Sequence, residues 1–172
     1  MTYQLTLATL TLAVSASIAT AKVWINELHY DNSGADANEF VEIVVAPDMA
    51  GIDLSTVDVH LYNGATGARY DTINFAAPTS QSSQNGFGVY SVSFAPLQNG
   101  APDGLALAIN GTLVAGQFLS YEGVFAGVGG PADGLLSIDL GVAETSSTAS
   151  DESIQLTGVG DEYPDFLWTD PA

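Results

Sequence analysis

Apolar and polar residues alternate with a period of two wherever the pattern along this chain is clean. The alternation runs through residues 41–45, 57–62, 105–109 and 153–157, which carry valine, leucine or isoleucine at every second position. In the first of these segments, Glu42 lies on the face opposite to its valine and isoleucine neighbours. This period is typical of half-buried strands. Beyond residue 21, no window of a dozen residues sustains an apolar stripe at helical spacing, so we predict a series of short strands.

Asparagine–glycine pairs separate several of the predicted strands. Both residues of such a pair tolerate the positive φ that two-residue hairpin turns require. The clearest predicted hairpin joins residues 104–109 to 112–121, whereas residues 76–102 and 123–150 are rich in Gly, Ser, Thr, Pro and Ala and are expected to be excursions between strands. Short strands joined by turns predict an all-β fold, an antiparallel β-sandwich, with a barrel as the alternative. The four pairs are Asn63-Gly64, Asn85-Gly86, Asn99-Gly100 and Asn110-Gly111.

Composition supports one folded domain and limits the classes of partner that it can bind. The chain has 172 residues, of which 47% are hydrophobic and 13% charged, so a single core can form. Twenty acidic residues against Lys22 and Arg69 give a formal net charge of −18. Nucleic-acid surfaces need lysine and arginine to replace the counterions of the phosphates, so direct nucleic-acid binding is not expected. The chain has no cysteine, which excludes disulfides, zinc ribbons and cysteine nucleophiles.

The first 21 residues predict a cleavable signal peptide. Residues 5–19 are uncharged and apolar, and Ala19-Thr20-Ala21 supplies the small residues of a signal-peptidase site. Cleavage would leave Lys22 as the first residue of a secreted or cell-surface protein whose mature part, residues 22–172, carries no membrane span. The alternative is an N-terminal strand or anchor.

Two segments near the predicted mature N-terminus resemble the opening of bacterial lamin-tail domains. Residues 23–31 read VWINELHYD and residues 36–43 read DANEFVEI, which match the strand, short acidic loop and "EFVE" strand that open such domains. Further matches follow in the expected order and cover nearly all of residues 22–172. The resemblance implies an immunoglobulin-like sandwich. The further matches are residues 61–64, 99–107, 117–123 and 153–158.

The resemblance also implies a class of function. Bacterial lamin-tail domains often accompany secreted nucleases, other hydrolases or cell-surface proteins, and are similar to non-catalytic accessory modules. We therefore expect a module for extracellular or cell-surface attachment or positioning, with a protein or cell-surface partner. One alternative is a part of a secreted nuclease or other phosphoesterase whose catalytic domain is absent. Another is a calcium-binding adhesive surface protein. The chromatin association of the nuclear relatives depends on a basic surface, which this chain lacks.

The acidic loop over residues 31–39 is the strongest candidate site in the sequence. It gathers carboxylates and side-chain amides between two predicted strands, and calcium prefers six to eight oxygen ligands from flexible loops of this composition. The spacing is not that of an EF-hand. In the alternative interpretation, Asp31, Asn32 and Asn38 shape the loop through hydrogen bonds to its backbone. The candidate calcium ligands are Glu27, Asp31, Asp36 and Glu39.

No catalytic residue is expected from the sequence. His29 and His60 are the only histidines, and neither has the spacing of a catalytic motif or of a zinc site. His60 is predicted to be a surface residue, while His29 is placed to pair with Glu27 on the same strand.

The aromatic residues mostly fall on predicted strands, where large apolar side chains close a sandwich core. Exposure of Tyr30, Tyr62 and Tyr121 together would instead indicate a carbohydrate-binding or protein-binding surface. The residues concerned are Trp24, Tyr30, Phe40, Tyr62, Phe118, Tyr121, Phe166 and Trp168.

Overall fold

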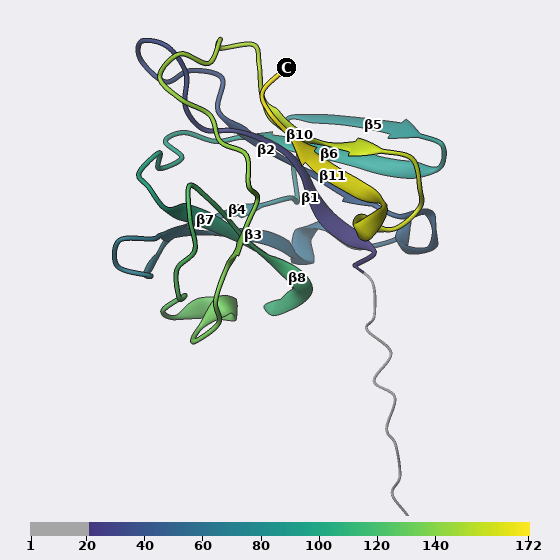
Figure 1. Cartoon of the computed structure of the whole chain (residues 1–172). Coiled ribbons are helices and arrows are strands. Elements are labelled where there is room, and N and C mark those ends of the chain that lie inside the picture. The colour runs from purple at the N-terminus through teal and green to yellow at the C-terminus, as the bar shows by residue number, and fades with distance from the viewer. Residues whose placement is uncertain (1–20) are drawn as a thin grey trace, which may run out of the picture.

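Strands form where the alternating pattern predicts them, and they assemble into two facing sheets (Figure 1). The computed structural model describes residues 21–172. One sheet has six strands in the order β11-β10-β1-β2-β6-β5, and the other has five in the order β4-β3-β7-β8-β9. All pairings are antiparallel except that of β8 with β9. The two layers form a β-sandwich, as predicted.

The elements of the described part have the following bounds. The strands are β1 (Val23–His29), β2 (Phe40–Val45), β3 (Val57–Asn63), β4 (Arg69–Asn74), β5 (Ser80–Gln84), β6 (Phe87–Ser93), β7 (Asp103–Ile109), β8 (Thr112–Tyr121), β9 (Ile138–Asp139), β10 (Ile154–Gly158) and β11 (Phe166–Thr169). Short 3₁₀ helices lie at η1 (Pro47–Met49), η2 (Leu54–Thr56), η3 (Gly130–Ala132) and η4 (Tyr163–Asp165). Within this part of the chain, no helix is long and apolar enough to cross a membrane.

The main core lies between the sheets and uses the residues that the alternation assigns to the inner face. Burial of such apolar surface stabilises the fold by about 25 cal/mol per Å² removed from water. The six-stranded sheet contributes side chains from β1, β2 and β10, and the five-stranded sheet contributes side chains from β3, β4, β7 and β8. From the six-stranded sheet, the core includes Val23, Ile25, Leu28, Val41, Ile43, Val45 and Ile154. From the five-stranded sheet, it includes Val57, Val59, Leu61, Ile73, Leu105, Leu107 and Leu119.

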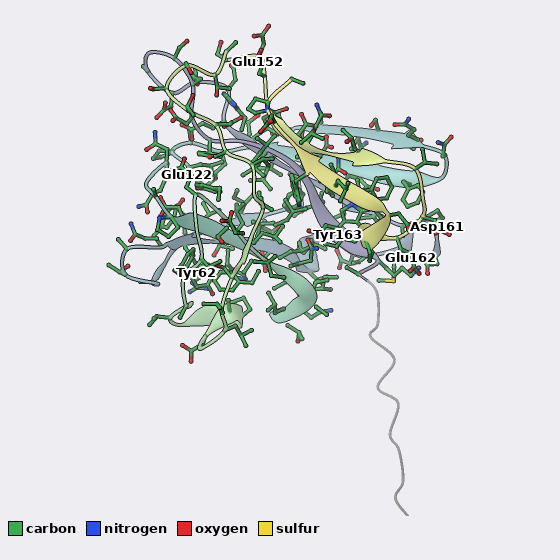
Figure 2. The ribbon with its side chains drawn as sticks, viewed as in Figure 1. Tyr62, Glu122, Glu152, Asp161, Glu162 and Tyr163 are labelled. Carbon is green, nitrogen blue, oxygen red and sulfur yellow. The ribbon has the colours of Figure 1, made fainter. Side chains whose placement is uncertain are left out.

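The segment between β8 and β9 covers the outer face of the five-stranded sheet. Phe125 packs edge-on against Phe118, and Tyr62 donates a hydrogen bond to the carbonyl of Gly129 at 2.7 Å and accepts one from the amide of Ala132 at 3.2 Å. Figure 2 shows Tyr62 in the lower part of the view, on the five-stranded sheet. The prediction that His60 is a surface residue is therefore wrong: it lies on the same outer face and is only 7% exposed.

The predicted turns and excursions are only partly confirmed. Asn110-Gly111 and Asn85-Gly86 both have positive φ and close two-residue hairpins, β7–β8 and β5–β6. Asn63-Gly64 instead opens a longer loop that ends at β4. The prediction of an excursion over residues 76–102 is wrong, because β5 and β6 lie within it. The residues of β5 are all exposed serine and glutamine, so they show no apolar alternation.

The predicted signal peptide falls almost entirely outside the described residues. Only its last residue, Ala21, belongs to the described part, where it is 8% exposed and packs in the small cluster that contains Trp24. The carbonyl of Lys22 already accepts a hydrogen bond from the amide of Ala46 at 2.8 Å. The sandwich thus includes the residue that cleavage would make the first.

Candidate functional site

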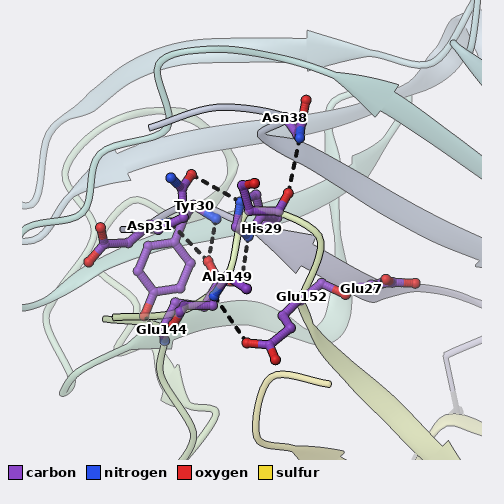
Figure 3. Close-up of polar contacts among 12 residues, drawn as sticks. Glu27, His29, Tyr30, Asp31, Asn38, Glu144, Ala149 and Glu152 are labelled. Atoms are coloured by element: carbon purple, nitrogen blue, oxygen red, sulfur yellow. Dashed lines mark hydrogen bonds and ion pairs between the residues drawn. The ribbon is translucent and has the colours of Figure 1, made fainter. Parts of the chain in front are cut away.

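The acidic loop that follows β1 is held by a carboxylate from a distant part of the chain. Glu144, in the segment between β9 and β10, has no exposed surface. One of its oxygens faces Nδ1 of His29 at 2.8 Å, and the other accepts hydrogen bonds from the amides of Tyr30 at 2.5 Å and Asp31 at 2.9 Å (Figure 3). Loss of this carboxyl group would leave buried donors without a partner, which costs about 1–3 kcal/mol for each group, so this contact is a firm anchor.

His29 is fully engaged inside this anchor. Its Nε2 lies 3.1 Å from the carbonyl of Ala37 and 3.3 Å from the side-chain oxygen of Asn32. The expected pairing of His29 with Glu27 is wrong, because both ring nitrogens are used by other partners and Glu27 accepts a hydrogen bond from Ser153 at 2.5 Å. The histidine is 1% exposed and makes structural contacts on both sides of its ring.

A chain of tyrosines extends the anchor across the sandwich. The ring of Tyr30 stacks on that of Tyr121 with centroids 3.9 Å apart, and its hydroxyl accepts a hydrogen bond from the amide of Glu144 at 2.8 Å. The hydroxyl of Tyr121 donates to the carbonyl of Gln98, whose amide donates to the hydroxyl of Tyr70 at 3.0 Å. Tyr70 lies on β4 and Tyr30 follows β1. The network therefore joins the two sheets at one end.

The three tyrosines whose joint exposure would indicate a binding surface are buried. Tyr30 and Tyr62 have no exposed surface, and Tyr121 is 2% exposed. They belong to the interior, and the condition set for a tyrosine-based carbohydrate or protein surface is not met.

The structure does not bring the four predicted calcium ligands together. The carboxylate of Glu39 is buried and accepts a hydrogen bond from the amide of Leu97, while that of Asp36 accepts one from the side chain of Asn99 at 3.2 Å. Glu27 and Asp31 point to opposite sides of the Glu144 anchor (Figure 3). Among residues 21–172, no group of three or more histidine or acidic side chains is placed to hold a metal ion.

The alternative interpretation of the acidic loop matches the contacts that its amides make. The side-chain oxygen of Asn32 accepts a hydrogen bond from the amide of Ala37 at 2.8 Å, and its nitrogen donates to the carbonyl of Ala35 at 3.2 Å. Asn38, which has a positive φ of 61°, donates to the carbonyl of Ser150 at 3.0 Å. These side chains shape the loop and fasten it to the segment before β10.

A groove lies on the outer face of the six-stranded sheet. It has a volume of about 600 Å³ and runs across β10, β1, β2, β6 and β5. Its wall at one end is aromatic, where Trp24 packs against Phe87 and Phe166 at centroid distances of 5.9 and 6.0 Å. Aliphatic and polar side chains line the rest. The aliphatic ones are Val44, Val89, Leu156 and Val159, and the polar ones are Asn26, Glu27, Glu42, Ser82, Gln84, Asn85, Gln155 and Thr157.

Two carboxylates oppose each other within this groove. Glu27 on β1 and Glu42 on β2 are direct cross-strand partners, and a register shift between Ile25 and Glu27 marks a bulge in β1 at this point. Bulges re-aim side chains, which explains why both Asn26 and Glu27 line the groove. Burial raises the pKa of Glu42, the hydrogen bond from Asn26 at 2.9 Å lowers it, and the charge of Glu27 raises it.

The groove is the part of the site that sequence reasoning missed. The alternation places Glu42 on the outer face, and Glu27 is among the candidate ligands, but nothing in the sequence indicates that the two are neighbours. Their pairing depends on the register of β1 against β2 and on the bulge. Like charges placed directly opposite on adjacent strands are destabilising, so the pair costs stability unless a ligand neutralises it.

Comparisons with known proteins add no further assignment. No family model, curated protein or solved structure matches this chain.

The Glu144 anchor predicts a large loss of stability on a small change. Glu144→Gln keeps the size of the side chain but places an amide next to buried donors, so we expect the free energy of unfolding to fall by about 3 kcal/mol. Urea unfolding followed by tyrosine and tryptophan fluorescence measures it. The matched control is Glu122→Gln, an exposed residue that accepts a hydrogen bond from the hydroxyl of Tyr30 at 3.2 Å, and should cost less than about 0.5 kcal/mol. Equal losses for the two variants would contradict the anchor.

Buried carboxyls predict greater stability in mild acid. Burial is the main cause that raises the pKa of Glu39, Glu42, Asp103 and Glu144. The folded chain therefore holds protons that the unfolded chain releases, and stability is lost as pH rises through the raised pKa values. We expect the melting temperature to rise between pH 8 and pH 5, and His60, whose pKa is lowered by burial, opposes part of this rise because the folded protein resists its protonation. Calorimetry at constant ionic strength tests this, and a melting temperature that falls over this range would refute it.

Proposed function

We propose that this chain is a secreted, non-catalytic accessory module of the lamin-tail type, which binds a basic segment of an extracellular or cell-surface protein in the groove of its six-stranded sheet. The support for the lamin-tail type and for export is the sequence, through the resemblance over residues 22–172 and the apolar segment before Lys22. The support for the binding mode is the geometry of the groove.

The single observation that carries the proposal is the pair of carboxylates in the groove. Glu27 and Glu42 oppose each other on adjacent strands, and the pKa of Glu42 is raised by burial and by the charge of Glu27. A lysine or arginine side chain between them would relieve the repulsion and bring its own hydrogen-bond donors, which carboxylates accept. A carboxyl group in a groove whose pKa is raised by burial and by a neighbouring carboxylate is a candidate for function on physical grounds.

The rest of the groove suits an extended polypeptide. Amides and hydroxyls from Asn26, Gln84 and Gln155 line its polar part and can both donate and accept hydrogen bonds. Trp24 is only 1% exposed, so the aromatic end offers an apolar wall and not an open stacking platform for sugar rings. The net charge of −18 would also attract a basic partner over a distance, which raises the rate of encounter.

Removing the carboxylate pair should weaken binding and strengthen the fold. For Glu27→Gln/Glu42→Gln we expect at least about a tenfold weaker affinity for a fluorescein-labelled peptide of alternating lysine and serine, equal to about 1.4 kcal/mol. We also expect a gain of roughly 0.5–1 kcal/mol in the free energy of unfolding, because the like-charge pair is gone. Fluorescence anisotropy at about 0.15 M salt, where the Debye length is about 8 Å, reports the affinity.

A charge-matched variant separates the groove from general attraction. Asp71→Asn/Asp170→Asn changes the net charge by the same amount at exposed positions that do not line the groove. We expect its affinity to stay within about twofold of the unchanged protein, since distant surface charges are largely screened at this salt. Equal weakening by the two double variants would show that binding follows net charge alone and would contradict the proposed site.

A further inference from the structure

One edge of the sandwich carries no charged residue. No charged residue occurs between Asp71 and Asp103, the longest uncharged run in a chain with a net charge of −18. This run contains the β5–β6 hairpin, whose outer strand β5 is the free edge of the six-stranded sheet. Figure 1 shows the hairpin at the upper right, where β5 lies outermost.

The other edges of the described sheets carry charges on or beside the edge strand. β4 contains Arg69 and Asp71, β9 contains Asp139, and β11 lies between Asp165 and Asp170. Charges, prolines and bulges on edge strands are the usual devices that prevent strand pairing between molecules. β5 itself has none of them: its residues are serine and glutamine, all five are exposed, and its pairing with β6 shows no register shift. Pro78 lies two residues before the strand.

The hairpin geometry fixes which backbone groups of β5 are free. Asn85 and Gly86 form a two-residue turn with φ of 52° and 87°, so the flanking residues Gln84 and Phe87 are a hydrogen-bonded pair. Bonding to β6 then alternates along the strand. Gln81 and Ser83 are left with amide and carbonyl groups that point away from the sheet.

The free groups of β5 are complementary to those of the same strand in a second copy. In an antiparallel pair with Ser82 at the two-fold axis, Gln81 of each copy faces Ser83 of the other, and both pairs exchange backbone hydrogen bonds. A charged partner would find no complementary charge here. A second copy is repelled by the acidic surface elsewhere and meets the least repulsion at this neutral edge.

We propose that two copies of this chain pair through β5 to form a symmetric dimer with one continuous sheet. The two-fold axis stands perpendicular to that sheet, so both grooves open on the same side. Ser82 and Gln84 of β5 line the groove, which places the two grooves next to each other across the junction. One long partner, or two copies of a short one, can then be held at both grooves, which raises avidity without any new contact.

Sedimentation velocity of the purified protein tests the pairing. Because the two acidic bodies repel each other, we expect dimer formation to strengthen as salt rises from about 0.05 M to about 0.5 M and the Debye length shortens. Two variants should weaken the dimer by at least about tenfold. Gln81→Glu/Ser83→Glu places like charges opposite each other across the junction. Ser83→Pro removes an outward amide without adding charge, and proline is tolerated on an edge strand at such a position.

A matched control and a fold check make the outcome decisive. Leu135→Glu/Leu136→Glu adds the same charge at exposed positions of the segment between β8 and β9, which do not line the groove, and its dimer should stay within about twofold of the unchanged protein. Circular dichroism of each variant identifies any that fails to fold. The dimer affinity is then compared for the β5 variants that do fold. A monomer at every salt and protein concentration, or dimers of the β5 variants equal to the control, would overturn the proposal.

Discussion

The rest of this structure depends on the burial of one carboxylate, Glu144. It lies in the long segment between β9 and β10 and bonds to His29, to the amides of Tyr30 and Asp31 and, through its own amide, to the hydroxyl of Tyr30. A buried charge costs several kcal/mol unless hydrogen bonds compensate it, and breaking such a set is correspondingly costly. The contact fixes where the acidic loop and the segment before β10 meet, and so where β10 joins β1.

A chain segment covers the outer face of the five-stranded sheet, whereas the outer face of the six-stranded sheet carries an open groove. This difference explains where binding is proposed. On the five-stranded sheet, Phe125 and the hydrogen bonds of Tyr62 keep the segment after β8 packed against the strands. On the six-stranded sheet, no described segment covers the strands between the aromatic cluster of Trp24 and the free edge of β5, and the groove remains. The groove holds Glu27 and Glu42 at a cost to stability, which a basic ligand would offset. The uncharged edge strand β5 borders this groove through Ser82 and Gln84.

The sequence predicts the sandwich well because its core follows one simple rule. In residues 41–45, 57–61 and 105–107, every second residue is valine, leucine or isoleucine, and these side chains lie between the sheets. β5 escaped prediction because an edge strand exposed on both faces needs no apolar residue. The burial of His60 could not be predicted because a segment distant in the sequence covers its face. The partner of His29 could not be predicted because Glu144 lies far along the chain. Such contacts depend on tertiary folding, which local patterns do not encode.

Native-state hydrogen exchange at the amides of Tyr30 and Asp31 tests most directly whether the Glu144 anchor holds the structure together. Both amides donate to that carboxylate and lie at and just after the end of β1, where a loop would otherwise exchange quickly. If the Glu144 anchor holds the structure together, both amides exchange only with global unfolding, at the same free energy as the central strands β2 and β7. Fast exchange of both amides, at the rate of exposed loop residues, would contradict it.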